Sequence, residues 1–302
     1  MRSVLATALV GLSKDKDFAF LTGDLGFMAL EPVRAAAGER FINAGVAEQN
    51  MISVAAGMAR LGFRPWVYSI APFLYARAFE QVRNDVCFHK LPVFLVGNGG
   101  GYAYGVMGAT HHALQDYGAL LGLPNLRVYV PAFAADVPVA AERIVRAGGP
   151  AYFRLGRDET PKNAVLPAYA PWRRLLAGRG PALVIVGPLA GGILAAAMDR
   201  PDQIRPALWV LSELPLLPDE IPPALLDDIQ RSGHLVVVEE HVIEGGVGQA
   251  LAHALLLCGA APKRFSHRYA LGYPSGFYGS QNYHRKECGL DPQSIIALIE
   301  KT

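Results

Sequence analysis

Short apolar runs alternate with helical segments along the first half of the chain. Runs of strand length predict buried strands near residues 18–24, 40–45, 64–70, 91–97, 126–132 and 151–157. Between them, apolar residues recur at helical spacing and predict helices near residues 3–12, 47–61, 74–89, 113–122 and 134–147. This alternation is typical of a parallel sheet that helices cover on both faces.

A second set of elements follows a Pro-containing stretch that has no clear periodicity. Strands are predicted near residues 181–187, 205–211 and 234–240, and helices near residues 189–199, 222–232 and 246–258. We therefore expect an α/β protein with two parallel-sheet domains. The first domain is expected at residues 1–165, a linker at 166–180 and the second domain at 181–302.

Composition and charge narrow the possible partners. The chain has 302 residues, of which 52% are hydrophobic and 18% charged, as in a globular protein with a large core. The formal net charge is only +2, and no stretch interleaves basic with aromatic residues, so we expect no nucleic acid partner. Three widely spaced cysteines form neither a disulfide framework nor a zinc motif, which fits a reducing cytoplasm.

Two apolar stretches could be taken for export or membrane signals. Residues 1–12 place Leu5, Leu9 and Leu12 at helical spacing, which favours an amphipathic first helix over a cleaved signal. Residues 180–198 are long enough to span a bilayer, but Pro181 and Pro188 divide them into a strand, a loop and a helix. We expect a cytoplasmic protein that does not enter the membrane.

Ligands of open α/β sheets bind beyond the carboxyl ends of the strands, where Glu48 is expected. Glu48 lies in "NAGVAEQN" (43–50), between a predicted buried strand and a helix of small and apolar residues, with no obvious cationic partner nearby. A buried carboxylate is costly unless hydrogen bonds compensate it. Either the helix N-terminus satisfies Glu48 or a ligand does.

Other segments at this edge offer further polar groups. The glycine run "GNGGGYAYG" (97–105) fails the dinucleotide fingerprint and predicts a flexible loop near a ligand. In "GATHHALQD" (108–116), adjacent histidines cannot both face one metal ion from a regular element, so we expect one in a cleft and one facing elsewhere; a capping histidine is the alternative. Arginines at this edge would suit a phosphorylated or carboxylated substrate or form surface ion pairs; they are Arg77, Arg154 and Arg157.

Taken together, these segments resemble the C-terminal half of the transketolase family of thiamine diphosphate enzymes, which includes deoxyxylulose phosphate synthase. The resemblance runs in order through residues 41–96, 108–132, 151–157 and 239–252. Its most specific element is "GVAEQNM" (45–51) together with "GATHH" (108–112). It implies a pyrimidine-binding domain followed by a smaller C-terminal domain.

The resemblance assigns a role to Glu48. In this family the glutamate at this position hydrogen-bonds N1′ of the aminopyrimidine of thiamine diphosphate. A carboxyl group that shares its proton with N1′ favours the imino tautomer, whose 4′ nitrogen can then take the proton from C2 of the thiazolium ring. Phe73 matches the aromatic residue that stacks on the pyrimidine, with Tyr75 as the alternative, and Asp24 matches an acidic residue near the cofactor.

The same resemblance implies substrate contacts. His111 matches a histidine that contacts carbonyl or hydroxyl groups of the donor. Arg77, Arg154 and Arg157 lie near positions that bind acceptor phosphates. At Met107, relatives that use sugar phosphates usually carry an Asp that accepts a hydrogen bond from a substrate hydroxyl, and a thioether accepts such a bond only weakly. The resemblance therefore implies a donor or acceptor that differs from the usual pentose phosphates.

A second departure concerns the other half of the family's architecture. No GDG sequence, which marks the diphosphate-binding domain, occurs in these residues. We expect no metal ligands in this chain and a separate N-terminal subunit that holds the diphosphate and Mg²⁺, in an assembly of the α₂β₂ type.

The predicted function is transfer of a two-carbon ketol unit from a ketose donor to an aldehyde acceptor by a split transketolase. The alternatives are the β subunit of a 2-oxoacid dehydrogenase, a decarboxylating acyloin-forming enzyme and a non-catalytic pairing subunit. Retention of Glu48, Phe73 and His111 argues against the last of these.

Overall fold

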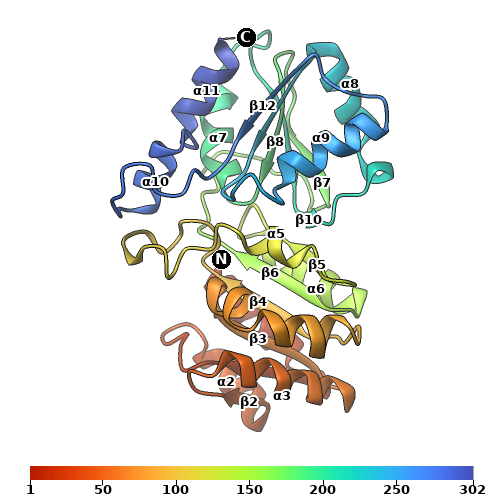
Figure 1. The fold of residues 1–302 in the computed structure, drawn as a ribbon, viewed down its shortest axis with the longest axis vertical. Coiled ribbons are helices and arrows are strands. Elements are labelled where there is room, and N and C mark those ends of the chain that lie inside the picture. Colours follow the sequence, from red (N-terminus) through yellow and green to blue (C-terminus); the bar gives the residue numbers. More distant parts are fainter. Residues whose placement is uncertain (302) are drawn as a thin grey trace.

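The computed structural model describes residues 1–301, which form two α/β halves, one above the other along the long axis of the molecule (Figure 1). A seven-stranded sheet has the order β10-β5-β6-β4-β3-β1-β2, and a five-stranded sheet has the order β12-β11-β8-β9-β7. Strands β1 to β6 run parallel to their neighbours within the first sheet, whereas β10 pairs antiparallel with β5. The predicted α/β class with two mostly parallel sheets is confirmed.

The strands of the larger sheet, in chain order, are β1 (Phe18–Thr22), β2 (Phe41–Asn43), β3 (Arg64–Ile70), β4 (Phe94–Asn98), β5 (Arg127–Tyr129), β6 (Ala151–Leu155) and β10 (Glu213–Leu214). The strands of the smaller sheet are β7 (Trp172–Leu176), β8 (Ala182–Val186), β9 (Ala207–Leu211), β11 (His234–Val238) and β12 (Arg264–Arg268). All nine predicted strands are present. Six of them are short, mostly apolar runs that are buried along all or nearly all of their length.

Helices cover both faces of the larger sheet. The α-helices of this half are α1 (Arg2–Leu12), α2 (Glu31–Ala37), α3 (Glu48–Arg60), α4 (Phe79–Gln81), α5 (Asp116–Leu120) and α6 (Asp136–Ala147). Helices α1, α2 and α6 pack on one face, and α3 and α5 on the other. The alternation of side chains along each strand supplies one apolar set to each face, as the predicted covering of the sheet by helices on both faces requires.

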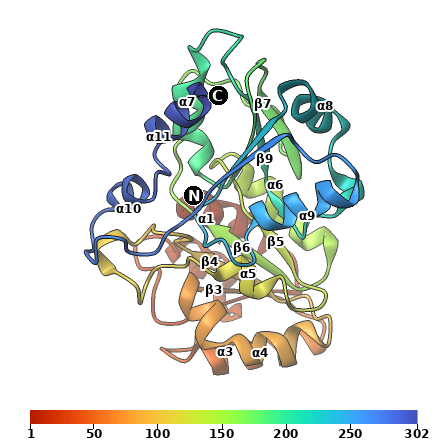
Figure 2. The same cartoon turned by 45° about the horizontal axis from the view of Figure 1, so that its top comes forward.

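The smaller sheet is covered in the same way. Its helices are α7 (Leu189–Met198), α8 (Pro223–Ser232), α9 (Val247–Leu257), α10 (Gln281–Glu287) and α11 (Pro292–Glu300). Figures 1 and 2 show α7 and α11 together on one side of this sheet and α8 and α9 on the other. Helices α10 and α11 and strand β12 were not predicted from the sequence.

The two halves share an apolar core and a strand pairing. Val128 and Val130 from the first half pack in one cluster with Trp209, Leu211 and Leu214 from the second. Strand β10 from the second half extends the sheet of the first. The segment predicted as a linker contains β7 (Trp172–Leu176). This strand was not predicted because its residues follow no apolar pattern; it forms by pairing antiparallel with β9.

Helices in the described part of the chain are too short or too polar to cross a membrane. The stretch at residues 180–198 forms β8, a turn and α7, as its prolines indicated.

Candidate active site at the carboxyl edge of the larger sheet

Four neighbouring strands bring the predicted cofactor-binding segments to one edge. Strands β2, β1, β3 and β4 are adjacent and parallel, so their carboxyl ends lie together. The segments that follow them carry Glu48, Asp24, Phe73 and His111. This is the edge at which ligands of open parallel sheets bind.

Glu48 begins α3, and its side chain is only 1% exposed. Ser69 Oγ donates to Glu48 Oε1 over 3.4 Å, and Arg77 Nη1 donates to Glu48 Oε2 over 2.6 Å. The expectation that Glu48 has no nearby cationic partner was therefore wrong. Arg77 lies 29 residues further along the chain and reaches Glu48 only because β2 and β3 both flank β1.

Arg77 and Phe73 lie on the same π-helical turn, η2 (Phe73–Arg77). The guanidinium carbon of Arg77 is 4.2 Å from the centroid of the Phe73 ring, and the Phe73 and His111 ring centroids are 5.3 Å apart in an edge-to-face arrangement. Glu48, Arg77, Phe73 and His111 thus form a continuous row. The sequence predicted one regular helix at 74–89, but two π-helical turns interrupt it, and such turns are frequent at functional sites.

The two adjacent histidines face different surroundings, as the sequence indicated. His111 is partly exposed and hydrogen-bonds Thr110 Oγ1 through Nδ1 over 2.9 Å. His112 is buried, with Nδ1 2.8 Å from the Tyr273 hydroxyl and Nε2 2.8 Å from the Gly105 carbonyl oxygen. Burial lowers the pKa of His112, so its imidazole stays neutral and can donate one bond and accept the other.

Asp24 lies on a tight turn beside Glu48. Asn43 Oδ1 accepts from the Asp24 backbone N–H over 2.9 Å, and Asn43 Nδ2 donates to Asp24 Oδ1 over 3.2 Å. At Gly23, a Cβ atom would lie 3.0 Å from the Gly45 carbonyl oxygen and 3.7 Å from Glu48 Oε1. Glycine at this position therefore lets the turn approach the glutamate closely.

Tyr75 and Arg154 lie inside the protein rather than at the open edge. The Tyr75 hydroxyl donates to Gln115 Oε1 over 3.2 Å, and the residue is 7% exposed, which favours Phe73 as the aromatic residue available to a ligand. Arg154 is 4% exposed and donates to Asp116, to the Ala113 carbonyl and to the Glu240 carbonyl. These contacts favour a structural ion pair for Arg154, which is one of the two roles that the sequence left open.

Arg157 is exposed and does not join the row at Glu48. It lines a separate cavity of about 650 Å³ together with Leu189, Arg285, Lys286 and Pro292. The three arginines that the sequence grouped together therefore have different surroundings: Arg77 contacts Glu48, Arg154 lies in the core, and Arg157 lies between the two halves of the chain.

Several residues of the site were not predicted. Ser69 and Asn43 hold Glu48 and Asp24, and Tyr104 lies 5.9 Å from His111 between ring centroids. Ser69 and Asn43 are polar residues at the carboxyl ends of otherwise apolar strands, which is the signal that could have identified them. Tyr273 comes from the second half of the chain, and nothing in its local sequence indicates its contact with His112.

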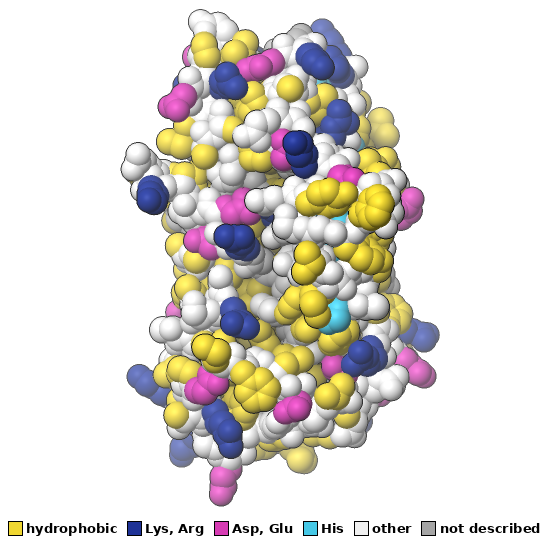
Figure 3. All heavy atoms as spheres, turned by 90° about the vertical axis from the view of Figure 1, so that its left-hand side faces the viewer, with side chains coloured by type: hydrophobic (Ala, Val, Ile, Leu, Met, Phe, Trp, Pro, Cys, Tyr) yellow, Lys and Arg dark blue, Asp and Glu magenta, His cyan; other side chains and the backbone are white. Residues whose placement is uncertain are grey.

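The surface beside the site is strongly apolar. Exposed fractions reach 71% for Phe27, 93% for Met28, 74% for Val46, 72% for Val106 and 70% for Phe277. Figure 3 shows hydrophobic side chains gathering over the middle of this face next to histidine. Exposed apolar patches of this kind mark surfaces that other molecules cover.

Metal ligands are not grouped in residues 1–301: no cluster of three or more His, Cys, Asp or Glu side chains could hold a metal ion there. The site therefore offers a buried carboxylate, an aromatic surface and a histidine. These groups suit an organic ligand that carries polar groups beside an apolar or aromatic surface.

The fold and this edge define an α/β protein with two mostly parallel sheets and a buried glutamate at the carboxyl edge of the larger one. Residues 1–162 match the family model described as "Transketolase, pyrimidine binding domain". The chain belongs to the transketolase family, and the resemblance seen in its sequence is confirmed. Members of this family use thiamine diphosphate.

Relatives correspond to the C-terminal part of transketolase-like enzymes. A subunit of the apulose-4-phosphate transketolase of Actinobacillus succinogenes is 31% identical, over 86% of this chain and 84% of the relative. 1-Deoxy-D-xylulose-5-phosphate synthase 2 of Geobacter sulfurreducens is 32% identical, over 86% of this chain but only 42% of that enzyme. The solved structure described as "Split gene transketolase, inactive beta4 tetramer" has a TM-score of 0.81 and 30% identity, and covers 99% of this chain and 96% of that chain.

Proposed function

We propose that this chain is the C-terminal subunit of a split transketolase and that it transfers a two-carbon ketol unit from a ketose donor to an aldehyde acceptor. The observation that carries the proposal is Glu48. Its buried carboxylate lies at the ligand edge with only two side-chain donors, in a row with Phe73 and His111. The similarity to transketolase subunits over most of their length supports the same interpretation.

The residues present suit the aminopyrimidine half of thiamine diphosphate. Glu48 would hold a proton at N1′ of the pyrimidine, and Phe73 would offer an aromatic surface beside it. The cofactor, when bound, supplies the carbon nucleophile that carries the two-carbon unit. Arg77 is 42% exposed, so it can turn toward solvent or substrate when a ligand nitrogen takes its place on the carboxyl group.

His111 and Asp24 would complete the binding of cofactor and donor. His111 is partly exposed at the end of the glycine loop and can hydrogen-bond a donor carbonyl or hydroxyl. Arg77 and Arg157 are accessible enough to bind an acceptor phosphate or carboxylate, whereas Arg154 is held by Asp116. Met107 is 54% exposed and would favour a substrate that lacks the hydroxyl read by an acidic residue.

We further propose that a separate N-terminal subunit holds the diphosphate and its Mg²⁺. The described residues carry no group of metal ligands, and the relatives include a protein named as a transketolase subunit and a split-gene transketolase. The exposed apolar side chains beside the site, including Phe27, Met28 and Val106, would lie against this partner or a second copy of the chain in an α₂β₂ enzyme. A cytoplasmic location fits these substrates.

Reconstitution with the partner subunit tests the proposal. The chain alone should bind thiamine diphosphate weakly and show no turnover, and the mixture should consume ketose donors when an aldehyde is supplied. Turnover with pyruvate or another 2-oxoacid, but not with ketoses, would instead identify a 2-oxoacid dehydrogenase β subunit or an acyloin-forming enzyme. Turnover by the isolated chain, or micromolar cofactor binding by it, would contradict the split-site arrangement.

A further inference from the structure

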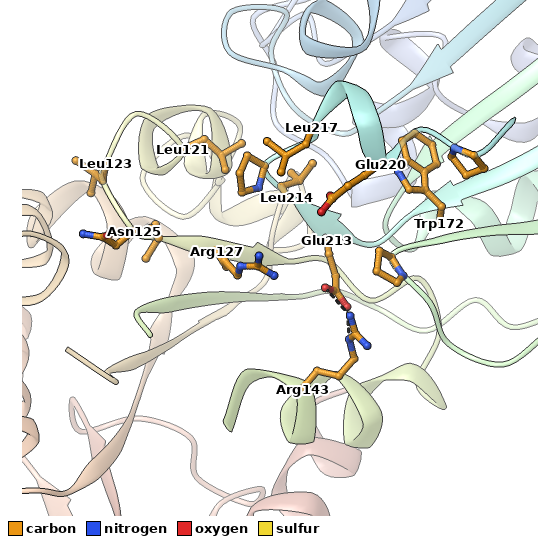
Figure 4. A pocket seen from close by; sticks show the side chains of 14 residues that line it. Leu121, Leu123, Asn125, Arg127, Arg143, Trp172, Glu213, Leu214, Leu217 and Glu220 are labelled. Carbon is orange, nitrogen blue, oxygen red and sulfur yellow. Dashed lines mark hydrogen bonds and ion pairs between the residues drawn. The ribbon is translucent and has the colours of Figure 1, made fainter. Parts of the chain in front are cut away.

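A cavity of about 640 Å³ lies where the two halves of the chain meet, away from the row at Glu48. Its walls come from the segment between α5 and β5, from α6, from β7 and from the segment that begins with β10 (Figure 4). The volume is within the range of small-molecule sites, about 300–1,000 Å³, and domain junctions are frequent places for them. None of the residues assigned to cofactor or substrate lines this cavity.

Apolar side chains from both halves form the body of the cavity. Leu121 and Leu123 come from the first half, and Leu217 and Trp172 come from the second. Leu217 is 42% exposed. An apolar group placed between these side chains would remove their surface from water, which is the main source of affinity in such sites.

Four charged side chains line the same cavity, and two of them are already paired. Arg143 Nε donates to Glu213 Oε1 over 2.6 Å, and Arg143 Nη2 donates to Glu213 Oε2 over 3.2 Å. This bidentate pair already occupies the charged groups of both Arg143 and Glu213.

The other two charged side chains, Arg127 and Glu220, form no ion pair within residues 1–301. Figure 4 shows the guanidinium of Arg127 and the carboxylate of Glu220 directed into the same space, below Leu217. A ligand that pairs with both must carry one anionic and one cationic group on an apolar body.

We propose that this cavity binds an α-amino acid with an apolar side chain. The ligand carboxylate pairs with Arg127, its ammonium group pairs with Glu220, and its side chain packs against Trp172 and the leucines. The inference goes beyond the proposed function and does not depend on it. Because the ligand would contact β5 and the segment after β10, its binding stabilises the pairing that joins the two halves.

Three related probes separate the contributions of the two charges. L-Phenylalanine carries both charged groups, N-acetyl-L-phenylalanine lacks the ammonium group, and L-phenylalaninamide lacks the carboxylate. Trp172 reports binding directly, because Trp66 and Trp209 are buried at 1% and 5% exposure and do not line the cavity. Selective excitation of tryptophan in the full chain should give a saturable change with L-phenylalanine that Trp172→Phe abolishes.

Charge-neutralising variants give the decisive comparison. Arg127→Gln and Glu220→Gln should each weaken L-phenylalanine binding by about tenfold or more, as expected for loss of a charge-assisted hydrogen bond. The controls Arg146→Gln and Glu142→Gln change exposed residues of α6 that do not line the cavity and should leave binding unchanged. Circular dichroism and thermal unfolding verify that each variant is folded.

Several results would overturn the proposal. These are the absence of saturable binding of L-phenylalanine, equal binding of the acetylated or amidated probe, and equal weakening by the α6 controls. A direct Arg127–Glu220 ion pair that closes the cavity would also overturn it. That pair would appear as non-additive losses of thermal stability in the two variants and their double variant, with no effect of added L-phenylalanine.

Discussion

Glu48 and Glu239 are buried glutamates that follow a parallel strand and lie at a helix N-terminus, one in each half of the chain. Their side chains are 1% and 0% exposed. Glu239 accepts hydrogen bonds from the Val247 and Gly248 backbone N–H groups at 2.8 Å, from His267 Nε2 at 2.7 Å and from the Tyr117 hydroxyl. Within residues 1–301, Glu48 accepts only from Ser69, over a long 3.4 Å, and from Arg77.

The difference shows that burial alone does not tell how much hydrogen-bonding capacity a carboxylate retains for a ligand. Both oxygens of Glu239 have two donors each, so a ligand would have to displace existing bonds. Glu48 Oε1 has one distant donor among the described residues, and the Arg77 side chain that pairs with Oε2 is 42% exposed. Glu48 therefore retains accepting capacity for a ligand, whereas Glu239 does not.

Glu48→Gln should have the largest effect. Glutamine keeps the size of the side chain but cannot exchange a proton, so kcat of the reconstituted enzyme should fall by about 10²–10⁴. Thermal stability should change little, because Arg77 can be solvated. Turnover measured beside thermal unfolding checks this. If turnover per folded molecule survives while stability falls by about 0.5–2 kcal/mol, Glu48 serves only the helix N-terminus.

Arg154→Gln should show the opposite behaviour. Arg154 and Asp116 are 4% and 0% exposed, and truncating one partner leaves the other charge buried without compensation. The free energy of unfolding should fall by about 3–5 kcal/mol, as measured by urea unfolding. Arg146→Gln, at an exposed position of α6, is the control and should change stability by less than about 0.5 kcal/mol. An unchanged stability in Arg154→Gln would restore the acceptor-binding role.

Glu239→Gln should destabilise the chain by about 1–3 kcal/mol. The side-chain nitrogen of glutamine would replace an accepting oxygen and face a hydrogen-bond donor. Burial tends to raise the pKa of Glu239, but hydrogen bonds from His267, Gly248 and Tyr117 outweigh burial and lower it. A lowered pKa means that this stabilisation is complete above about pH 4.5, the ordinary value, and is lost as pH falls through the folded-state pKa.

The pH dependence distinguishes Glu239 from other acids. Thermal unfolding followed from neutral to acidic pH should show a weaker loss of stability in Glu239→Gln than in the wild type. Glu142→Gln, which changes an exposed glutamate of α6, should retain the wild-type profile. Identical acid profiles for all three proteins would mean that Glu239 does not control this transition.

Arg77→Gln and Arg157→Gln address the accessible arginines. If either guanidinium binds an acceptor phosphate or carboxylate, its loss should raise KM for a charged acceptor by about tenfold. KM for a neutral acceptor should change much less. Steady-state kinetics with a phosphorylated aldehyde and its unphosphorylated counterpart make the comparison, and equal changes for both acceptors would exclude charge recognition.

Tyr273→Phe should have the smallest effect. It removes one hydrogen bond to His112 Nδ1 and should cost about 0.5–1.5 kcal/mol. Since His112 follows His111 directly, a modest fall in kcat should accompany this loss. Tyr278→Phe, at a side chain 53% exposed, is the control. A loss of stability equal in both variants would show that the Tyr273 hydroxyl does not hold the histidine segment.

The strands and most helices were predictable because their apolar patterns are local. Strand β12 was missed because its five residues are exposed or half-buried, so it has no apolar run. Strand β10 is two residues long and exists only through its pairing with β5. The π-helical turn at Phe73–Arg77 also escaped prediction, since side-chain periodicity does not distinguish it from a regular helix.

Candidate residues were predictable as a set, but their individual surroundings were not. Glu48, Phe73 and His111 were predicted from motif and resemblance, and the structure places them in one row. The Arg77 partner of Glu48 and the Tyr273 partner of His112 lie 29 and 161 residues away from them in the chain. Such pairs leave no mark in local composition.

The sequence by itself determined the α/β class, the order of the main strands and the family, because these depend on the spacing of apolar residues and on contiguous motifs. Only the tertiary structure decided which buried charges are satisfied. Arg154 and Arg157 are separated by two residues in the chain, yet one is held by Asp116 in the core and the other lines an open cavity. Residues distant in the chain supply hydrogen-bond donors and acceptors, so a charged side chain's capacity for a ligand depends on folding.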